Sequence, residues 1–165
     1  MSILIDGHNL IGQIADLALS DPDDEARLVQ RLKVYRNVAN RPITVVFDPG
    51  PSYTPPHNLS GGGVEVVFAN RKSSADELIM ARIWRYPDPG HLLVVSSDRE
   101  IMEVARSRGA EVVTAQDFAR MMAKFHGPKR QRSKRLPQEA GLSQREVQEW
   151  LDLFRSRSKK SRVKR

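Results

Sequence analysis

Four aspartates occupy positions from which their side chains could meet at one edge of a sheet. Asp6, Asp48 and Asp98 each follow closely on a short apolar run, and Asp76 lies in the first turn of a predicted helix. In open parallel sheets, ligands bind beyond the carboxyl ends of the strands. We therefore expect the four carboxylates to converge at that edge.

Carboxylates brought close together repel one another unless a cation neutralises them. Oxygen ligands in a chain without cysteine favour a hard ion, Mg²⁺ or Mn²⁺, over zinc. Such an ion lowers the pKa of a water molecule and stabilises charge on a phosphate during transfer, the chemistry of phosphodiester hydrolysis. The residues alone predict a metal or phosphate site.

Each aspartate also has a structural alternative. Asp98 has the position of a helix cap, Asp76 would complement a helix dipole, and Asp48 begins an Asp-Pro-Gly turn. For Asp117 the structural reading is favoured, because it follows Thr114 at the spacing of a capped helix start.

Other common catalytic motifs are missing from the sequence. It contains no Walker-type phosphate loop, no dinucleotide-binding glycine motif and no nucleophile elbow. The histidines show no metal-ligand spacing. His8 lies near Asp6 but is not assigned as a ligand.

The elements that must position these residues alternate between strand and helix. Short apolar and β-branched runs predict strands, and capping motifs with helical periodicity predict the helices between them. The first helix is expected to open at Ser20-Asp21-Pro22, with Pro22 in its first position. This alternation predicts an α/β three-layer sandwich with a mostly parallel five-stranded sheet. The predicted strands are 2–5, 43–47, 64–68, 92–95 and 111–113, and the later helices run from 74 to about 85, from 99 to 109 and from 114 to about 126.

Charge divides the chain into a body and a basic extension. Residues 1–126 hold 14 Lys and Arg against 16 Asp and Glu, a net charge of −2, whereas residues 127–165 hold 13 against 4, a net charge of +9. The predicted organisation is a domain at 1–126, a basic linker at 127–141, an amphipathic helix at 142–155 and a basic disordered tail at 156–165. The extension indicates a polyanionic partner, with a merely solubilising tail as the alternative.

The composition also bears on where the protein works. No apolar run is long enough to span a membrane, and no secretory signal pattern precedes Asp6. The absence of cysteine fits a reducing cytoplasm, so we expect a cytoplasmic protein without a membrane partner.

Several of these segments resemble one known family in the right order. Segments 3–12, 45–48, 63–77 and 94–100 are similar to the strands and acidic helix of NYN domains, specifically the YacP-like branch of the PIN-like nucleases. The stretch 142–154 resembles the C-terminal helix of that branch. The likeness covers nearly the whole chain.

The resemblance implies a PIN-like fold and RNA cleavage with Mg²⁺ or Mn²⁺. It places Asp6, Asp76 and Asp98 on the family's metal-binding acids and Asn9 on its signature asparagine, while Asp48 matches a frequent acid of the second strand. The family usually has Tyr where His8 stands, a difference that bears on how substrate stacks beside the site. Some members act on ribosome-associated RNA.

We therefore expect a metal-dependent endoribonuclease whose basic residues bind the RNA backbone. The expected RNA contacts are Arg71 and Lys72 before the acidic helix, and Lys129, Arg130, Arg132, Lys134 and Arg135 in the linker. Three alternatives remain open. They are a non-catalytic RNA- or ribosome-binding module, a DNA nuclease related to the flap endonucleases, and a toxin.

Overall fold

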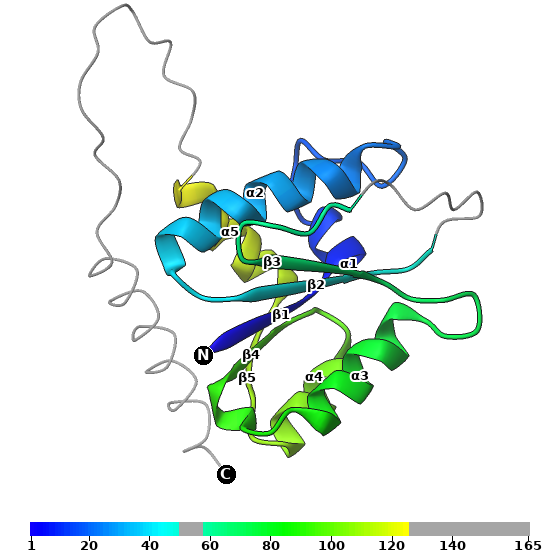
Figure 1. The fold of residues 1–165 in the computed structure, drawn as a ribbon, viewed down its shortest axis with the longest axis vertical. Coiled ribbons are helices and arrows are strands. Elements are labelled where there is room, and N and C mark those ends of the chain that lie inside the picture. The colour runs from blue at the N-terminus through cyan, green and yellow to red at the C-terminus, as the bar shows by residue number, and fades with distance from the viewer. Residues whose placement is uncertain (50–57, 126–165) are drawn as a thin grey trace, which may run out of the picture.

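A parallel five-stranded sheet forms the centre of the computed structural model, which describes residues 1–49 and 58–125 (Figure 1). All four pairings between its strands are parallel, in the order β3-β2-β1-β4-β5. This confirms the predicted α/β fold, with every pairing parallel where the prediction was a mostly parallel sheet. The strands are β1 (Ser2–Asp6), β2 (Ile43–Phe47), β3 (Val64–Phe68), β4 (Leu92–Val95) and β5 (Glu111–Val113).

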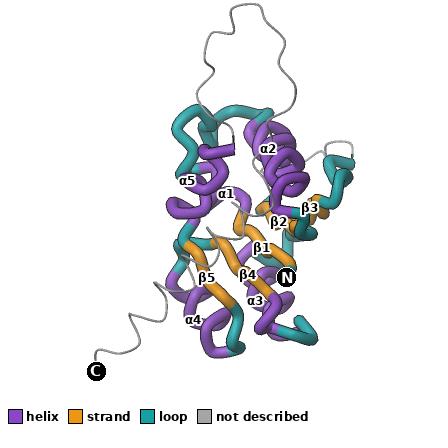
Figure 2. The backbone as a smooth tube through the Cα atoms, turned by 90° about the vertical axis from the view of Figure 1, so that its left-hand side faces the viewer, coloured by secondary structure: helices purple, strands orange, loops and turns teal. Residues whose placement is uncertain are grey.

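Helices cover both faces of this sheet, as parallel strands require. Figure 2 shows α1, α2 and α5 on one side of the strands and α3 and α4 on the other. The helices are α1 (Gly7–Ile11), α2 (Asp24–Ala39), α3 (Ala75–Arg85), α4 (Arg99–Ser107) and α5 (Ala115–Phe125), and a short 3-10 turn, η1 (Pro89–His91), precedes β4.

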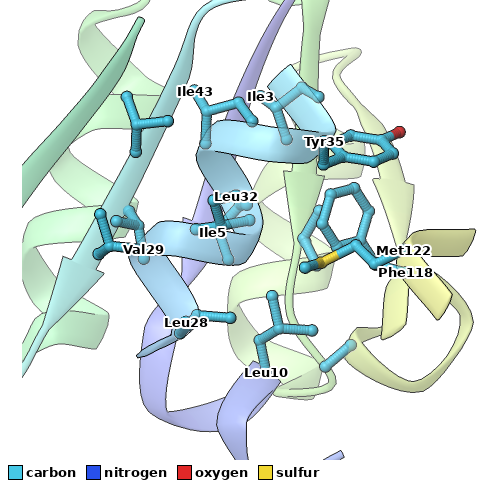
Figure 3. Packing of buried hydrophobic residues seen from close by; sticks show 14 of the residues in the cluster. Ile3, Ile5, Leu10, Leu28, Val29, Leu32, Tyr35, Ile43, Phe118 and Met122 are labelled. Carbon is cyan, nitrogen blue, oxygen red and sulfur yellow. The ribbon is translucent and has the colours of Figure 1, made fainter. Parts of the chain in front are cut away.

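The apolar core has two parts, one on each face. The larger part joins the sheet to α2 and α5, where the Tyr35 ring meets the Phe118 ring in Figure 3. The smaller part packs α3 and α4 on the other face through residues such as Ile79 and Ile101. A strand buried on both faces must be apolar at consecutive positions, which is why β4 reads Leu-Leu-Val-Val.

Two details of the helices differ from the sequence prediction. The five-residue helix α1 was not predicted, because its single turn is too short to show a helical period. The expected start of α2 at Pro22 is wrong. The Asp21 side chain accepts a hydrogen bond from the Asp23 amide, so Asp21 and Pro22 form a turn and the helix begins at Asp24.

The predicted linker, C-terminal helix and tail lie outside the described residues, so the domain boundaries remain predictions. Within residues 1–49 and 58–125, no helix is long and apolar enough to cross a membrane.

Candidate active site

The predicted acids gather where the strand order reverses. The chain passes from β1 outward to β2 and β3, then returns to β4 on the other side of β1. Open α/β sheets place ligands at such a switch point, beyond the carboxyl ends of the strands. Asp6 ends β1, and Ser96 and Asp98 follow β4, which pairs directly with β1.

Asp6 is almost completely buried at this edge, with 7% of its surface exposed. Its Oδ2 accepts a hydrogen bond from Ser96 Oγ at 3.2 Å, and its Oδ1 accepts one from the Asn9 amide at 3.4 Å. Burial raises the pKa of Asp6 from 3.8 to about 6. The two hydrogen bonds oppose this rise, whereas the charges of Asp76 and Asp48 add to it.

Asp76 interacts electrostatically with the other acids of this edge. It lies half-buried in the first turn of α3. Partial burial raises its pKa, and the negative charges of Asp98, Asp48 and Glu100 raise it further. Within residues 1–49 and 58–125, no positively charged side chain contributes to the pKa shift of Asp76 or Asp6. The four predicted aspartates therefore form one acidic cluster, and no basic residue in this part of the chain offsets either shift.

The N-terminus of α3 is held so that Asp76 stays near this edge. Asp48 Oδ1, at the end of β2, accepts a hydrogen bond from the Ala75 amide at 2.7 Å. Ser74 caps the same helix together with Glu77 in the predicted capping box. Strand β2 and helix α3 are thus fixed relative to each other through one of the acids.

The loop after β4 is tied to β1 and α1 by two serines that the sequence analysis did not single out. Ser96 Oγ accepts a hydrogen bond from the Asp98 amide while it donates to Asp6. The Ser97 amide donates to Asn9 Oδ1 at 3.1 Å. Asn9 therefore has a structural contact through its side-chain oxygen.

Glu100 is a second residue of the edge that the sequence analysis did not assign. It lies in the first turn of α4, exposed, and its charge acts on Asp76. A signal was present, since an acid two positions after a strand-end aspartate would face the same edge. Acidic residues are common in the first turn of helices, where they complement the helix dipole. This signal therefore does not distinguish a site residue from a purely structural one.

The structural alternatives for the aspartates are partly realised as well. Asp98 caps α4, with Oδ1 accepting hydrogen bonds from the Glu100 and Ile101 amides at 2.8 and 3.3 Å. Within the described residues, no three Asp, Glu or His side chains are arranged to hold a metal ion as they stand. Carboxylates without a counter-ion repel one another. A shared ion would therefore require side chains of the cluster to change position.

The remaining predicted residues lie around the cluster or away from it. His8 forms a 3.0 Å contact from Nε2 to Glu25 Oε1, and its ring packs 5.3 Å from the Phe47 ring. The Asp117 amide donates a hydrogen bond to Thr114 Oγ1 at 3.1 Å, the capping contact that the structural reading expects, and the Asp117 side chain pairs with Arg120.

The predicted RNA contacts divide into two groups. Arg71 and Lys72 are exposed in the turn that leads into α3, close in the chain to Asp76. The five linker residues are Lys129, Arg130, Arg132, Lys134 and Arg135, and all lie outside the described residues.

Comparison with known proteins gives one family and one solved fold. The family described as YacP-like NYN domain matches residues 3–155. The chain is similar to the crystal structure of Rae1 (YacP) from Bacillus subtilis, with a TM-score of 0.66 and 19% identity over 99% of this chain and 86% of that one. A tryptophan-to-leucine mutant of the same Bacillus subtilis protein aligns with a TM-score of 0.60 and 26% identity, over 75% of this chain and 76% of that one. No curated protein matches the chain.

Proposed function

The chain belongs to the YacP-like NYN domain family of PIN-like nucleases, and from that premise we propose that it is a divalent-metal-dependent endoribonuclease. The observation that carries the proposal is the environment of Asp76. Burial raises the pKa of Asp76 at the switch point of the sheet, and the charges of Asp98, Asp48 and Glu100 raise it further. No positive charge of the described residues lowers it. Repulsion of this kind is a cost that a bound cation would remove.

The donor set fits Mg²⁺ or Mn²⁺. Asp6, Asp76 and Asp98 would hold the ion, with Asp48 beside them and Glu100 as a further carboxylate at the rim. All of these are oxygen donors, and the chain has no cysteine. When bound, the cation would supply a water of lowered pKa and would neutralise charge on the phosphate.

The chain's own groups would orient the RNA. Asn9 would donate a hydrogen bond from Nδ2 to a phosphate oxygen, since its Oδ1 already accepts from the Ser97 amide. Arg71 and Lys72 would contact the phosphates beside the scissile bond. The basic linker would add affinity that is independent of sequence and sensitive to salt.

A substitution at Asp76 tests this assignment. Asp76→Asn should slow cleavage of a labelled structured RNA by roughly 100-fold or more, because it removes a metal ligand, while the thermal unfolding midpoint is kept or raised. The matched control is Asp117→Asn, an aspartate in the first turn of another helix, which should cleave at the wild-type rate. A fully active Asp76→Asn protein would refute the proposed site.

A non-catalytic RNA- or ribosome-binding module is the second candidate. The observation that favours it is that Asp6, Asp48 and Asp98 all accept hydrogen bonds from helix N-termini, a structural role that needs no catalysis. This alternative predicts RNA binding without cleavage. Presenting the RNA on translating ribosomes separates it from an enzyme that requires its substrate in that context.

A further inference from the structure

A second group of basic residues lies against a glycine turn at the far end of the edge strand β3. Gly61, Gly62 and Gly63 all have positive φ angles, of 146°, 59° and 79°. Two side chains of α2, Lys33 and Arg36, pack directly on this turn. A β-carbon on Gly63 would collide with the Arg36 guanidinium, and one on Gly62 would lie 3.5 Å from Lys33 Cγ. We call these five residues the cationic turn.

The two cations of the cationic turn lack acidic partners in the described part of the chain. The earlier arginines of α2 differ, since Arg27 pairs with Asp21 and Arg31 pairs with Asp16. No ion pair within residues 1–49 and 58–125 includes Lys33 or Arg36. The stretch 49–63 that leads into β3 contains no Asp or Glu.

Arg36 adds a second observation that points to a ligand. Its Nε atom is buried and has no hydrogen-bond acceptor among the described residues. A buried donor without an acceptor is costly, and native structures rarely leave one unexplained. Once the guanidinium shifts off Gly63, an anion at the cationic turn would provide the acceptor and would neutralise both side chains.

The cationic turn lies at one end of β3 and the acidic edge lies at the other. β3 is an edge strand of five residues, which spans roughly 16 Å. Its carboxyl end leads to the exposed Arg71 and Lys72, and then to Asp76. Between the two ends, the charge of Glu65 is balanced by Arg82 at 3.3 Å. Figure 1 shows β3 running along the outside of the sheet between these ends.

We propose that the cationic turn binds a backbone phosphate of the same RNA strand that is cut at the acidic edge, several nucleotides away from the scissile bond. This inference rests on the proposed function, because it takes the substrate to be RNA. The missing β-carbons of Gly62 and Gly63 let Lys33 and Arg36 lie against the turn, and these two side chains supply the charge. The substrate strand then follows the β3 edge and contacts Arg71 and Lys72 on the way.

The alternative is that Lys33 and Arg36 stabilise helix α2 and bind no RNA. Both lie toward the C-terminus of α2, where positive charge complements the helix dipole. That role predicts lower thermal stability when they are neutralised and no change in RNA binding. The two roles are therefore separable by experiment.

The test compares Lys33→Gln/Arg36→Gln with Arg27→Gln/Arg31→Gln, a matched pair of neutralisations on the same helix, in the full chain. Binding is measured in chelator with a long RNA and with an oligonucleotide too short to extend along β3. Loss of this phosphate contact should weaken binding of the long RNA about five- to tenfold and reduce the salt slope by about 0.7. The short oligonucleotide should bind both variants and the wild type equally.

The outcomes distinguish this inference from the proposed function. Unchanged affinity of Lys33→Gln/Arg36→Gln for the long RNA would overturn the inference, and a lowered midpoint of unfolding would then assign the cations to the helix dipole. A wild type that binds RNA but never cuts it would refute the nuclease while leaving this binding comparison valid. A wild type that binds no RNA would overturn both.

Discussion

At the scale of single residues, Asp6 shows how function and stability oppose each other. Its carboxylate is buried beside other carboxylates, and its pKa rises to about 6. A carboxyl whose folded pKa exceeds its unfolded value stabilises the fold when protonated. Its contribution is complete below pH 3.8 and is lost as the pH rises through 6. A metal site requires ionised Asp6. In the absence of metal, the protein is therefore less stable with Asp6 ionised than with Asp6 protonated.

Replacing Asp6 should accordingly stabilise the metal-free protein. We expect Asp6→Asn to raise the free energy of unfolding by about 1–3 kcal/mol at about pH 7.5, since one pKa unit corresponds to about 1.4 kcal/mol. Its stability should also vary less than that of the wild type between about pH 4 and 6. Denaturant unfolding in chelator across this pH range measures both effects.

The control variant, Asp16→Asn, should change the free energy of unfolding in the opposite direction. Arg31 forms a hydrogen-bonded ion pair with Asp16 and lowers the pKa of Asp16. Asp16→Asn should therefore leave the protein slightly less stable at neutral pH. A less stable Asp6→Asn protein would show that the Asp6 carboxylate contributes to the fold and is not a cost.

Added cation should stabilise the wild type and not the variants. Mn²⁺ at about one hundred times its dissociation constant would contribute roughly 3 kcal/mol if it binds only the folded state. Differential scanning fluorimetry should show this rise for the wild type and a much smaller one for Asp6→Asn and Asp76→Asn. An equal rise in all three proteins would place the cation elsewhere.

At the scale of elements, the start of the short helix α1 packs closely against the end of β2. Gly7 begins α1 directly after Asp6, and a β-carbon there would collide with the Phe47 ring at the end of β2. Phe47 is fully buried, so its ring has little room to move. The glycine lets the chain turn into α1 while Asp6 stays at the edge.

Gly7→Ala should disturb both the fold and the site. Overpacking of this kind costs about 1–3 kcal/mol, and the displaced α1 should also shift Asn9 from its contact with Ser97. Gly90→Ala is the matched control, because a β-carbon there makes only ordinary contact with Asp88. We expect thermal unfolding and cleavage to change in Gly7→Ala alone. Wild-type behaviour of Gly7→Ala would mean that the Phe47 ring moves aside easily.

The regular elements were predictable from the sequence because their signals are local. The strands at Ile43–Phe47, Val64–Phe68, Leu92–Val95 and Glu111–Val113 match the predicted ranges. The capping box at Ser74 also forms as predicted. Helix α1 and the start of α2 were missed or misplaced, since both depend on a single turn.

The arrangement of the site was only partly predictable. That Asp6, Asp48, Asp76 and Asp98 share one edge follows from parallel strands and was foreseen. The links through Ser96 and Ser97 were not, because they join residues about 90 positions apart in the chain. Whether each aspartate serves as a cap, a ligand or both depends on atomic geometry that a sequence pattern does not contain.

At the scale of the whole molecule, charge is separated between the body and the extension. The body up to residue 126 is slightly acidic, whereas residues 127–165 carry a net charge of +9. An acidic body repels RNA, so basic residues outside the acidic edge must supply the attraction. The linker cations and the cationic turn are the candidates for that role.

Neutralising the linker should weaken binding without slowing the cut. We expect the change of Lys129, Arg130, Arg132, Lys134 and Arg135 to Gln to reduce the salt slope of RNA affinity by roughly 0.7 for each phosphate no longer neutralised. Cleavage at saturating RNA should stay at the wild-type rate. Filter binding over a series of salt concentrations and single-turnover cleavage measure the two quantities. An unchanged slope would show that the linker does not bind RNA.

The most direct measurement is the cleavage rate of a labelled structured RNA as Mn²⁺ or Mg²⁺ is titrated into metal-free wild-type protein, with RNA binding followed in parallel. Our account predicts no cutting in chelator, cutting that saturates with either cation, and RNA binding that persists throughout. Cutting that continues in chelator would contradict a metal site at the acidic edge. RNA that is bound but never cut, even on translating ribosomes, would instead identify a binding module.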